Sequence, residues 1–272
     1  MAPNIHLVSV VGASVNVLPY LLSHYRALGV QSFFVNAHLS SEDDPVRGEI
    51  ERITGEFGCG IASVNVGDWQ TLQLGLYEKQ RREHPDDWFV LADHDELAHW
   101  PDGVVETIEY CDRQGYDYIR GCLVDRIARN GRFPVLRADE PLESQFPLGA
   151  FFANPVQGAD PRKVVAVKGA VPLVKGQHHA KSGRACPTRE HYLPVHHFKW
   201  HSGIEQRLAD RAVKLRDQGQ GHWVESARFA KYHSLSAGQI NMDDPNLWIG
   251  ECNPEYEHWE KVKGIVLRFP ST

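Results

Sequence analysis

The chain has 272 residues, a formal net charge of −6, and contents of 42% apolar and 24% charged residues. A chain of this length and ordinary composition can bury a substantial core, either as one α/β domain or as a domain with an appendage. The acidic balance excludes the broad basic face with which nucleic-acid-binding proteins contact phosphates. We therefore expect no nucleic-acid partner.

The cysteines and the apolar segments indicate the compartment. Five cysteines are widely spread and never stand in CxxC spacing. This excludes a disulfide framework and a zinc knuckle, and it favours a reducing interior. The N-terminus has no basic region and no long apolar stretch, and no other segment is typical of a spanning helix. We expect a cytoplasmic protein without an integral membrane segment, and its oligomeric state stays open.

Strands and helices alternate along the first part of the chain. Short apolar, β-branched runs predict strands at 5–11, 32–36, 60–66 and 88–92. Helical spacing of apolar residues predicts helices at 18–28, 49–57 and 69–83. This order predicts a parallel sheet with right-handed crossovers, an α/β fold.

The rest of the chain is less regular. We expect a helix over 101–114, a strand over 117–124, and a long irregular loop over 125–161, which holds five prolines. Two short strands at 163–167 and 171–174 and two helices near 204–215 and 224–232 follow. We find no repeat and no linker, so a single domain over 1–272 is predicted.

The most informative segment is the apolar run that begins at Trp88 and ends at three acids, Asp93, Asp95 and Glu96. Ligands of open α/β sheets bind beyond the carboxyl ends of strands, and residues i and i+2 of a strand point the same way. Paired carboxylates there suit a hard divalent cation held against phosphates. Alternatively, Asp95 or Glu96 caps the next helix, which would explain one acid only.

Six of the fifteen histidines fall between residues 178 and 201. Within this cluster, His197, Lys199 and Trp200 offer an imidazole, a cation and an aromatic ring close together. No HExxH or zinc-finger spacing is present. The alternative is a strand edge with Phe198 and Trp200 packed inward.

Asp125 follows the strand predicted over 117–124, so it emerges at the carboxyl edge of the sheet. A carboxylate there could accept a proton from an acceptor hydroxyl. An ion pair with Arg126 is the alternative. No Walker loop, no GxGxxG after the first strand and no GxSxG elbow is present, which disfavours P-loop, dinucleotide-binding and α/β-hydrolase functions.

Four segments together resemble the GT-A glycosyltransferases of the family 2-like group. They are residues 18–30, 86–97, 124–131 and 194–200, and the similarity spans about residues 4–235. The resemblance implies a Rossmann-like GT-A fold, with a mostly parallel sheet flanked by helices and a helical C-terminal region. It also implies a nucleotide-sugar-binding half (1–125), an acceptor-binding half (126–235) and a C-terminal extension (236–272).

Residue by residue, the resemblance makes Asp95 the principal ligand of a divalent metal, Mn²⁺ or Mg²⁺, bound to the donor diphosphate. Asp93 then contacts the ribose or the metal's waters, and His197 is a late metal or diphosphate ligand. The further residues expected to bind the nucleotide sugar are Val10, Gly12, Asn36, Asp68 and Lys199.

The chain departs from the family pattern at two points. Asn36 stands where many members have an aspartate against the base. No clear Glu-Asp pair marks a catalytic base, so Asp125 is the candidate, with Glu143 or Glu225 as substitutes.

The predicted function is metal-dependent transfer of a sugar from a nucleotide-sugar donor to a small-molecule or oligosaccharide acceptor. Three alternatives stay open. One is a nucleotidyltransferase that acts on a sugar phosphate. The second is a metal-dependent hydrolase built on His94, Asp95, His99 and the histidine cluster. The third is a binding module without catalysis.

Overall fold

The computed structural model describes residues 3–270, and these residues form two compact units. The first unit contains the chain up to residue 122 together with residues 162–195. The second contains residues 123–161 and the chain from residue 196 onward. Two strands, β6 (Tyr118–Ile127) and β9 (Tyr192–His197), contribute residues to both units.

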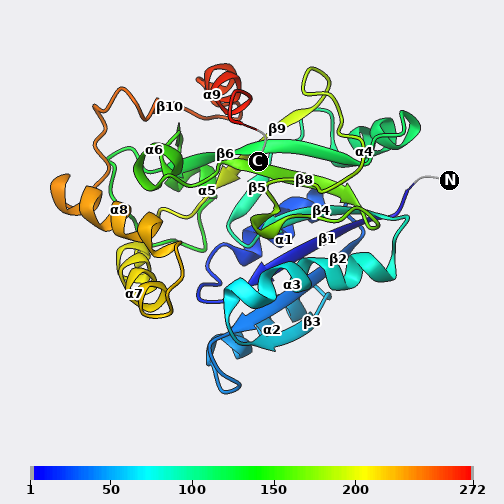
Figure 1. Ribbon diagram of the computed structural model, residues 1–272, viewed down its shortest axis with the longest axis horizontal. Helices are drawn as coiled ribbons and strands as arrows, with labels where there is room; N and C mark the ends of the chain where they lie inside the picture. Colours follow the sequence, from blue (N-terminus) through cyan, green and yellow to red (C-terminus); the bar gives the residue numbers. More distant parts are fainter. Residues whose placement is uncertain (1–2, 271–272) are drawn as a thin grey trace. The chain divides into compact units, whose positions relative to one another are not determined.

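The sheet of the first unit is mostly parallel (Figure 1). Strand β1 (Ile5–Val11) pairs in parallel with β2 (Ser32–Leu39) and β4 (Trp88–Asp93), and β3 (Ile61–Val66) extends the sheet beyond β2. Strand β8 (Arg162–Lys168) is antiparallel to both β4 and the first half of β6. Therefore β6 runs in the direction of β4, and β8 is the reversed strand.

Helices connect these strands as the alternating pattern predicts. They are α1 (Leu18–Ala27), α2 (Val46–Glu56), α3 (Trp69–Glu83) and α4 (Val104–Arg113). The short strand β5 (Glu96–Ala98) follows β4 and pairs with β9. The α/β class with a mostly parallel sheet flanked by helices is confirmed.

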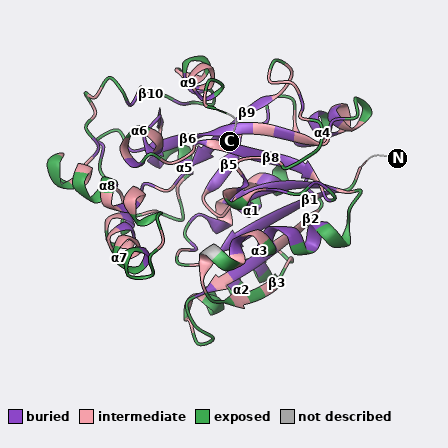
Figure 2. Cartoon of the chain, in the orientation of Figure 1, coloured by how far each residue is buried: buried purple, intermediate pink, exposed green. Residues whose placement is uncertain are grey.

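Burial explains why these segments are strands. The first five residues of β4 are buried, as in a central parallel strand covered on both faces. In β3, partly buried and exposed residues alternate, because this strand lies at the edge of the pairing order. Figure 2 shows the buried strands β1 and β4 against the more exposed β3.

The second unit contains an antiparallel part of the sheet and a core of its own. The second half of β6 pairs with β7 (Leu148–Ala150), which pairs with β10 (Gly250–Glu251), and both pairs are antiparallel. Its helices are α5 (Leu142–Gln145), α6 (Ala153–Gln157), α7 (Ile204–Asp217), α8 (Trp223–Leu235) and α9 (Trp259–Val266). The helical C-terminal region is therefore observed.

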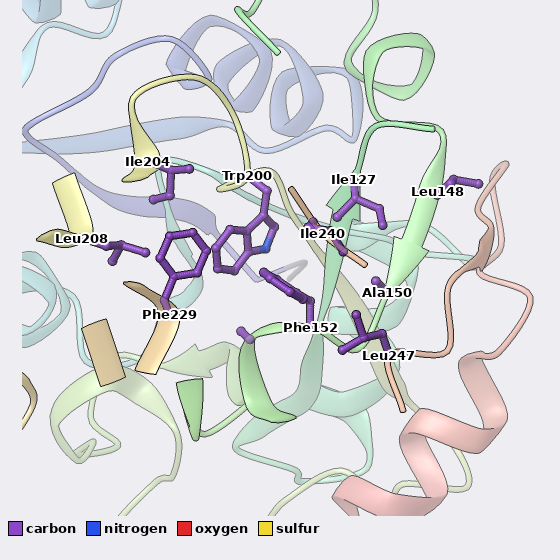
Figure 3. Packing of buried hydrophobic residues seen from close by; sticks show 11 residues of the cluster. Ile127, Leu148, Ala150, Phe152, Trp200, Ile204, Leu208, Phe229, Ile240 and Leu247 are labelled. Carbon is purple, nitrogen blue, oxygen red and sulfur yellow. The ribbon is translucent and has the colours of Figure 1, made fainter. Parts of the chain in front are cut away.

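Aromatic rings dominate the core of the second unit. The ring of Trp200 lies 4.5 Å from that of Phe152 in an edge-on contact and 5.3 Å from that of Phe229. Figure 3 shows Trp200 between these two rings, with Ile240 and Leu247 nearby. Such pairs add to the stabilisation that comes from burying their area.

Two predictions about local structure are wrong. Residues 125–161 are not an irregular loop, because they hold the end of β6 and all of α5, β7 and α6. Buried apolar side chains such as Phe146 and Phe152 order the short segments between the prolines. Residues 171–174 do not form a strand, and Leu173 makes only an isolated bridge with Ala180.

The boundaries of the units differ from the expected halves. The first unit includes nearly all of the expected nucleotide-sugar-binding half and also takes residues 162–195 from the expected acceptor-binding half. Among residues 3–270, no helix combines the length and apolar character needed to cross a membrane.

The aromatic core predicts a large stability effect. Phe152→Ala should lower the free energy of unfolding by about 3–5 kcal/mol, because it removes a buried ring and leaves a cavity against Trp200. Denaturant unfolding followed by tryptophan fluorescence measures this. The matched control is Val135→Ala in the same unit. Val135 is 72% exposed, so the change should stay within about 0.5 kcal/mol. Equal effects would contradict this view of the core.

Candidate functional site

The carboxyl ends of β1 and β2 approach each other closely at Gly12. A Cβ atom at residue 12 would lie 2.5 Å from the carbonyl oxygen of His38, so this position requires glycine. The His38 ring is 2.9 Å from the Gly67 carbonyl oxygen through Nε2, and its centroid is 5.2 Å from that of Trp69. These contacts hold together the ends of β1, β2 and β3 where a ligand of an α/β sheet binds.

Asp93, at the end of β4, is held by two residues from other elements. The Tyr77 hydroxyl of α3 donates to Oδ1, and Lys163 Nζ of β8 lies 3.1 Å from Oδ2. The same ammonium lies 2.9 Å from Glu96 Oε1, and Glu96 Oε2 accepts the backbone N–H of Asp93 at 3.2 Å. Lys163 is 6% exposed and Glu96 is 3% exposed. The chain therefore supplies a buried cation for two of the three acids.

The pKa directions follow from this arrangement. Burial alone raises the pKa of Asp93, but the Lys163 charge and the Tyr77 hydrogen bond outweigh it and hold that pKa below the usual range. Burial alone lowers the pKa of the Lys163 ammonium, but the charges of Asp93 and Glu96 outweigh this effect and raise that pKa. Burial and the nearby Asp93 charge raise the pKa of Tyr77 well above its ordinary value. Asp93 and Lys163 are thus ionised at neutral pH, and Tyr77 stays protonated as a donor.

His94 and Asp95 form the turn after β4, and both residues are partly exposed. The Asp95 charge raises the pKa of Asp93, so the two carboxylates are close enough to repel each other. The Nε2 atom of His94 is buried and has no hydrogen-bond partner among the described residues. Helix α4 begins at Val104 without a side-chain cap, so neither Asp95 nor Glu96 serves as its cap.

The pair Asp93 and Asp95 fits a divalent cation of the magnesium type. Such an ion keeps several waters and needs only one or two protein carboxylates beside substrate phosphates. Hydrogen bonds from Tyr77 and Lys163 orient Asp93, as partners behind a ligating carboxylate do. Within the described part of the chain, no three His, Cys, Asp or Glu side chains group into a metal cage. The metal-hydrolase alternative needs His94 and Asp95 on a helix, whereas both residues lie in the turn after β4.

Three residues expected to bind the nucleotide have other contacts. Asn36 is fully buried, and its side-chain amide donates to the Leu76 carbonyl at 2.9 Å while Ser63 Oγ donates to its Oδ1 at 2.6 Å. Val10 packs in the apolar core of the first unit. Asp68 is the N-cap of α3, and its carboxylate accepts the Thr71 N–H at 3.0 Å. These contacts give the three side chains structural roles that the sequence did not indicate.

Asp125, in the second unit, is 2% exposed and fully occupied by hydrogen bonds. Its Oδ2 accepts the N–H groups of Phe152 at 3.0 Å and Ala153 at 2.7 Å. Its Oδ1 accepts Trp200 Nε1–H at 2.7 Å and lies 3.0 Å from His197 Nδ1. An ionised carboxylate only accepts, so Nδ1 of His197 carries the hydrogen. Asp125 therefore fixes the tautomer of His197.

The contacts of Asp125 favour a positioning role over the predicted role as a proton acceptor. Burial raises its pKa, but the hydrogen bond and charge of His197 and the N–H groups of Ala153 and Trp200 outweigh this and lower the pKa. A carboxylate of low pKa with four donors is a poor general base. The alternative ion pair with Arg126 is not formed either. Arg126 instead donates to the Phe146 carbonyl, 3.0 Å from Nε, and contacts Nδ1 of His196 at 2.8 Å.

The remaining candidates also lie in the second unit. Glu143 is exposed on α5, and Glu225 on α8 pairs with Arg211 at 3.7 Å and with His222 at 3.4 Å. Lys199 Nζ lies 3.3 Å from Gln157 Oε1. The structure thus joins Asp125 to His197 within the second unit, whereas Asp93 and Asp95 belong to the first.

Tyr77 and Lys163 have roles in the site that the sequence did not indicate. Lys163 lies near the start of β8 and precedes an apolar run, and a lysine at the end of a buried run is a signal for a buried partner. Tyr77 lies on the buried face of α3 with Leu76 and is indistinguishable in the sequence from a core residue.

Comparison with known proteins finds no matching family model and no matching curated protein. Among solved structures, the chain is similar to a mannosyltransferase from Pyrobaculum calidifontis, described in complex with GDP-Man and Mn²⁺. That likeness has a TM-score of 0.43 and 11% identity, over 89% of this chain and 77% of that one.

Two further solved structures are similar to this chain. TarS from S. aureus has a TM-score of 0.39 and 9% identity, over 84% of this chain and 43% of that one. Mannosyl-3-phosphoglycerate synthase from Rubrobacter xylanophilus has a TM-score of 0.38 and 11% identity, over 90% of this chain and 78% of that one. Each TM-score is below 0.5, so these likenesses carry no argument about function. The function proposed below is therefore argued from the residues of this chain.

Removal of the buried cation should lower the free energy of unfolding by an amount that depends on pH. In Lys163→Met, Asp93 and Glu96 lose their shared partner, and unfolding free energy should fall by about 3–5 kcal/mol at pH 8. Burial then raises the pKa of both acids in the folded state. An acid with a raised folded pKa contributes stability at low pH and loses it as pH rises, so the deficit should shrink toward pH 5.

Denaturant unfolding between pH 5 and pH 8 tests this expectation. Lys79→Met is the matched control, because Lys79 is exposed on α3 of the same unit. A deficit for Lys163→Met that equals that of the control, or that does not vary with pH, would show that the ammonium does not hold the two acids.

Proposed function

We propose that the protein is a glycosyltransferase that moves a sugar from a nucleotide-sugar donor to an acceptor hydroxyl or amine. One observation carries this proposal. An ionised, positioned Asp93 stands beside Asp95 at the carboxyl end of a central parallel strand, where sheets of this class bind nucleotides. Lys163 is bonded to Asp93 and Glu96. Asp95 lies partly exposed in the turn after β4 and brings a second carboxylate close to Asp93.

In this proposal, each of several residues of the first unit has a separate role in binding the donor. Asp95 holds a divalent metal, Mn²⁺ or Mg²⁺, with Asp93 on the metal's waters or the ribose. When bound, this cation stabilises the negative charge that develops on the departing diphosphate. Lys163 and Tyr77 keep Asp93 in one rotamer and one charge state. Gly12 allows the His38 carbonyl at the end of β2 to approach the end of β1 closely.

The second unit supplies the predicted acceptor side. Asp125 acts as a positioning residue, because its carboxylate fixes the ring of His197, the predicted late ligand of the metal or diphosphate. Lys199 stays a candidate for a phosphate contact. Glu143 and Glu225 stay the candidate bases, and Glu143 is the more exposed of the two.

Asp95→Asn tests the donor site. It should weaken metal-dependent binding of a nucleoside diphosphate by about 100-fold and abolish turnover, because the amide cannot replace the carboxylate charge on a hard cation. Calorimetric titration of UDP and GDP with and without Mn²⁺ measures binding. The matched control is Asp86→Asn in the exposed loop before β4, which should bind and turn over like the wild type. Normal turnover of Asp95→Asn in excess chelator would refute the proposal.

The released product separates the two transferase reactions. Sugar transfer from a nucleotide sugar releases a nucleoside diphosphate, whereas a nucleotidyltransferase releases pyrophosphate from a nucleoside triphosphate. The proposal expects the diphosphate, measured by chromatography of the reaction mixture. Release of pyrophosphate with a triphosphate and a sugar phosphate would support the alternative instead.

A further inference from the structure

Arg81, in the last turn of α3, is a buried cation that the donor site does not use. Its side chain is 1% exposed. Its Nη2 group donates to the carbonyl oxygens of Val171 and, at 3.5 Å, of Gly169. Its Nε and Nη1 atoms are buried and have no hydrogen-bond partner among the described residues. Two unsatisfied N–H groups on a buried guanidinium are costly unless something accepts from them.

The charge of Arg81 is not balanced by a neighbouring acid. Burial lowers the pKa of Arg81 to about 10, so the group is still charged at neutral pH. The nearest acid is Glu78, one turn earlier on α3, but its carboxylate is bonded to Arg82. Arg81 and Arg82 outnumber the one acid, Glu78, among the charged residues that line the adjoining pocket.

Arg81 lines a pocket whose other walls are Glu78, Arg82 and residues 169–172. The pocket volume is about 90 Å³, several times the roughly 10–15 Å³ that one water needs on such a measure. It is far below the roughly 300 Å³ at which pockets for drug-sized ligands begin. The space therefore suits a small ligand and excludes a nucleotide.

The walls of this pocket are held in place by backbone contacts. The N–H of Gly169 donates to the Asp87 carbonyl at 2.9 Å, and that of Ala170 donates to the Pro85 carbonyl at 2.9 Å. A Cβ at residue 169 would lie 2.1 Å from the His84 carbonyl oxygen, so only glycine permits this approach. The N–H groups of Gly169 and Ala170 are thus already bonded, whereas Nε and Nη1 of Arg81 have no partner among the described residues.

We infer that this pocket is a binding site for a small oxyanion, such as phosphate, with Arg81 as its principal donor. Arginine presents its N–H groups in a fork that matches the oxygens of phosphate and carboxylate. The pocket adjoins Asp87, just before β4 begins, whereas Asp93 ends that strand. The oxyanion site is therefore separate from the donor site within the same unit.

Titration calorimetry with inorganic phosphate tests this inference, with acetate as a second arm at equal ionic strength. The wild type should bind one phosphate, and Arg81→Met should bind it on the order of tenfold or more weakly, because charge-assisted hydrogen bonds are lost. The matched control is Arg52→Met, which removes an exposed arginine of the same unit. It should bind like the wild type. Binding of acetate alone would identify the ligand as a carboxylate and overturn the choice of phosphate.

A second variant keeps Arg81 in place. Ala170 is exposed and lines the pocket, so Ala170→Asp puts a negative charge at its wall without disturbing the core. This variant should also lose phosphate binding while unfolding at the wild-type temperature. For the wild type, a saturating concentration of nucleoside diphosphate with Mn²⁺ should leave the affinity for phosphate unchanged. Equal affinity of the Arg81 variant and the wild type, or displacement of phosphate by the nucleotide, would overturn the inference.

Discussion

The shared ammonium of Lys163 is the interaction on which the rest of the first unit depends. Burying carboxylates at the end of β4 is unfavourable unless a cation accompanies them. Lys163, carried by the reversed strand β8, lies 3.1 Å from Asp93 and 2.9 Å from Glu96. Because β8 is antiparallel to β4, its Arg162 end lies beside the carboxyl end of β4, which brings Lys163 within reach of both acids. The reversed direction of β8 thus positions the buried cation.

In this arrangement, the buried charges that stabilise the fold and the carboxylate proposed to bind the metal belong to different residues. Glu96 and Lys163 are almost completely buried and neutralise each other, whereas Asp95 is partly exposed in the turn. A metal bound by Asp95 would meet an Asp93 carboxylate already fixed by Tyr77 and Lys163, so little side-chain entropy would be lost on binding. In the second unit, Asp125 fixes His197 by the same means, a buried carboxylate that orients its neighbour.

The sequence predicts the helices and strands of the first unit well. It does not predict which distant side chains contact the acids of the site. Helix α3 has the predicted bounds, 69–83, because its apolar spacing and its flanking turn residues agree. Asp93 was placed correctly at a strand end, since an apolar run followed by acids is a local pattern. The partner Lys163 is 70 residues away, and no local pattern identifies which cation meets which acid. The hydrogen bonds of Asp125 could not be predicted for the same reason, because its four donors come from residues 152–200.

The central claim is that Asp95 and Asp93 share a cation with a bound diphosphate. Anomalous diffraction from crystals soaked with Mn²⁺ and a nucleoside diphosphate tests it most directly. The account predicts a manganese peak in contact with Asp95, with the diphosphate bound beside it and Lys163 still bonded to Asp93. A nucleotide bound elsewhere, or a manganese ion that does not contact Asp95, would contradict it.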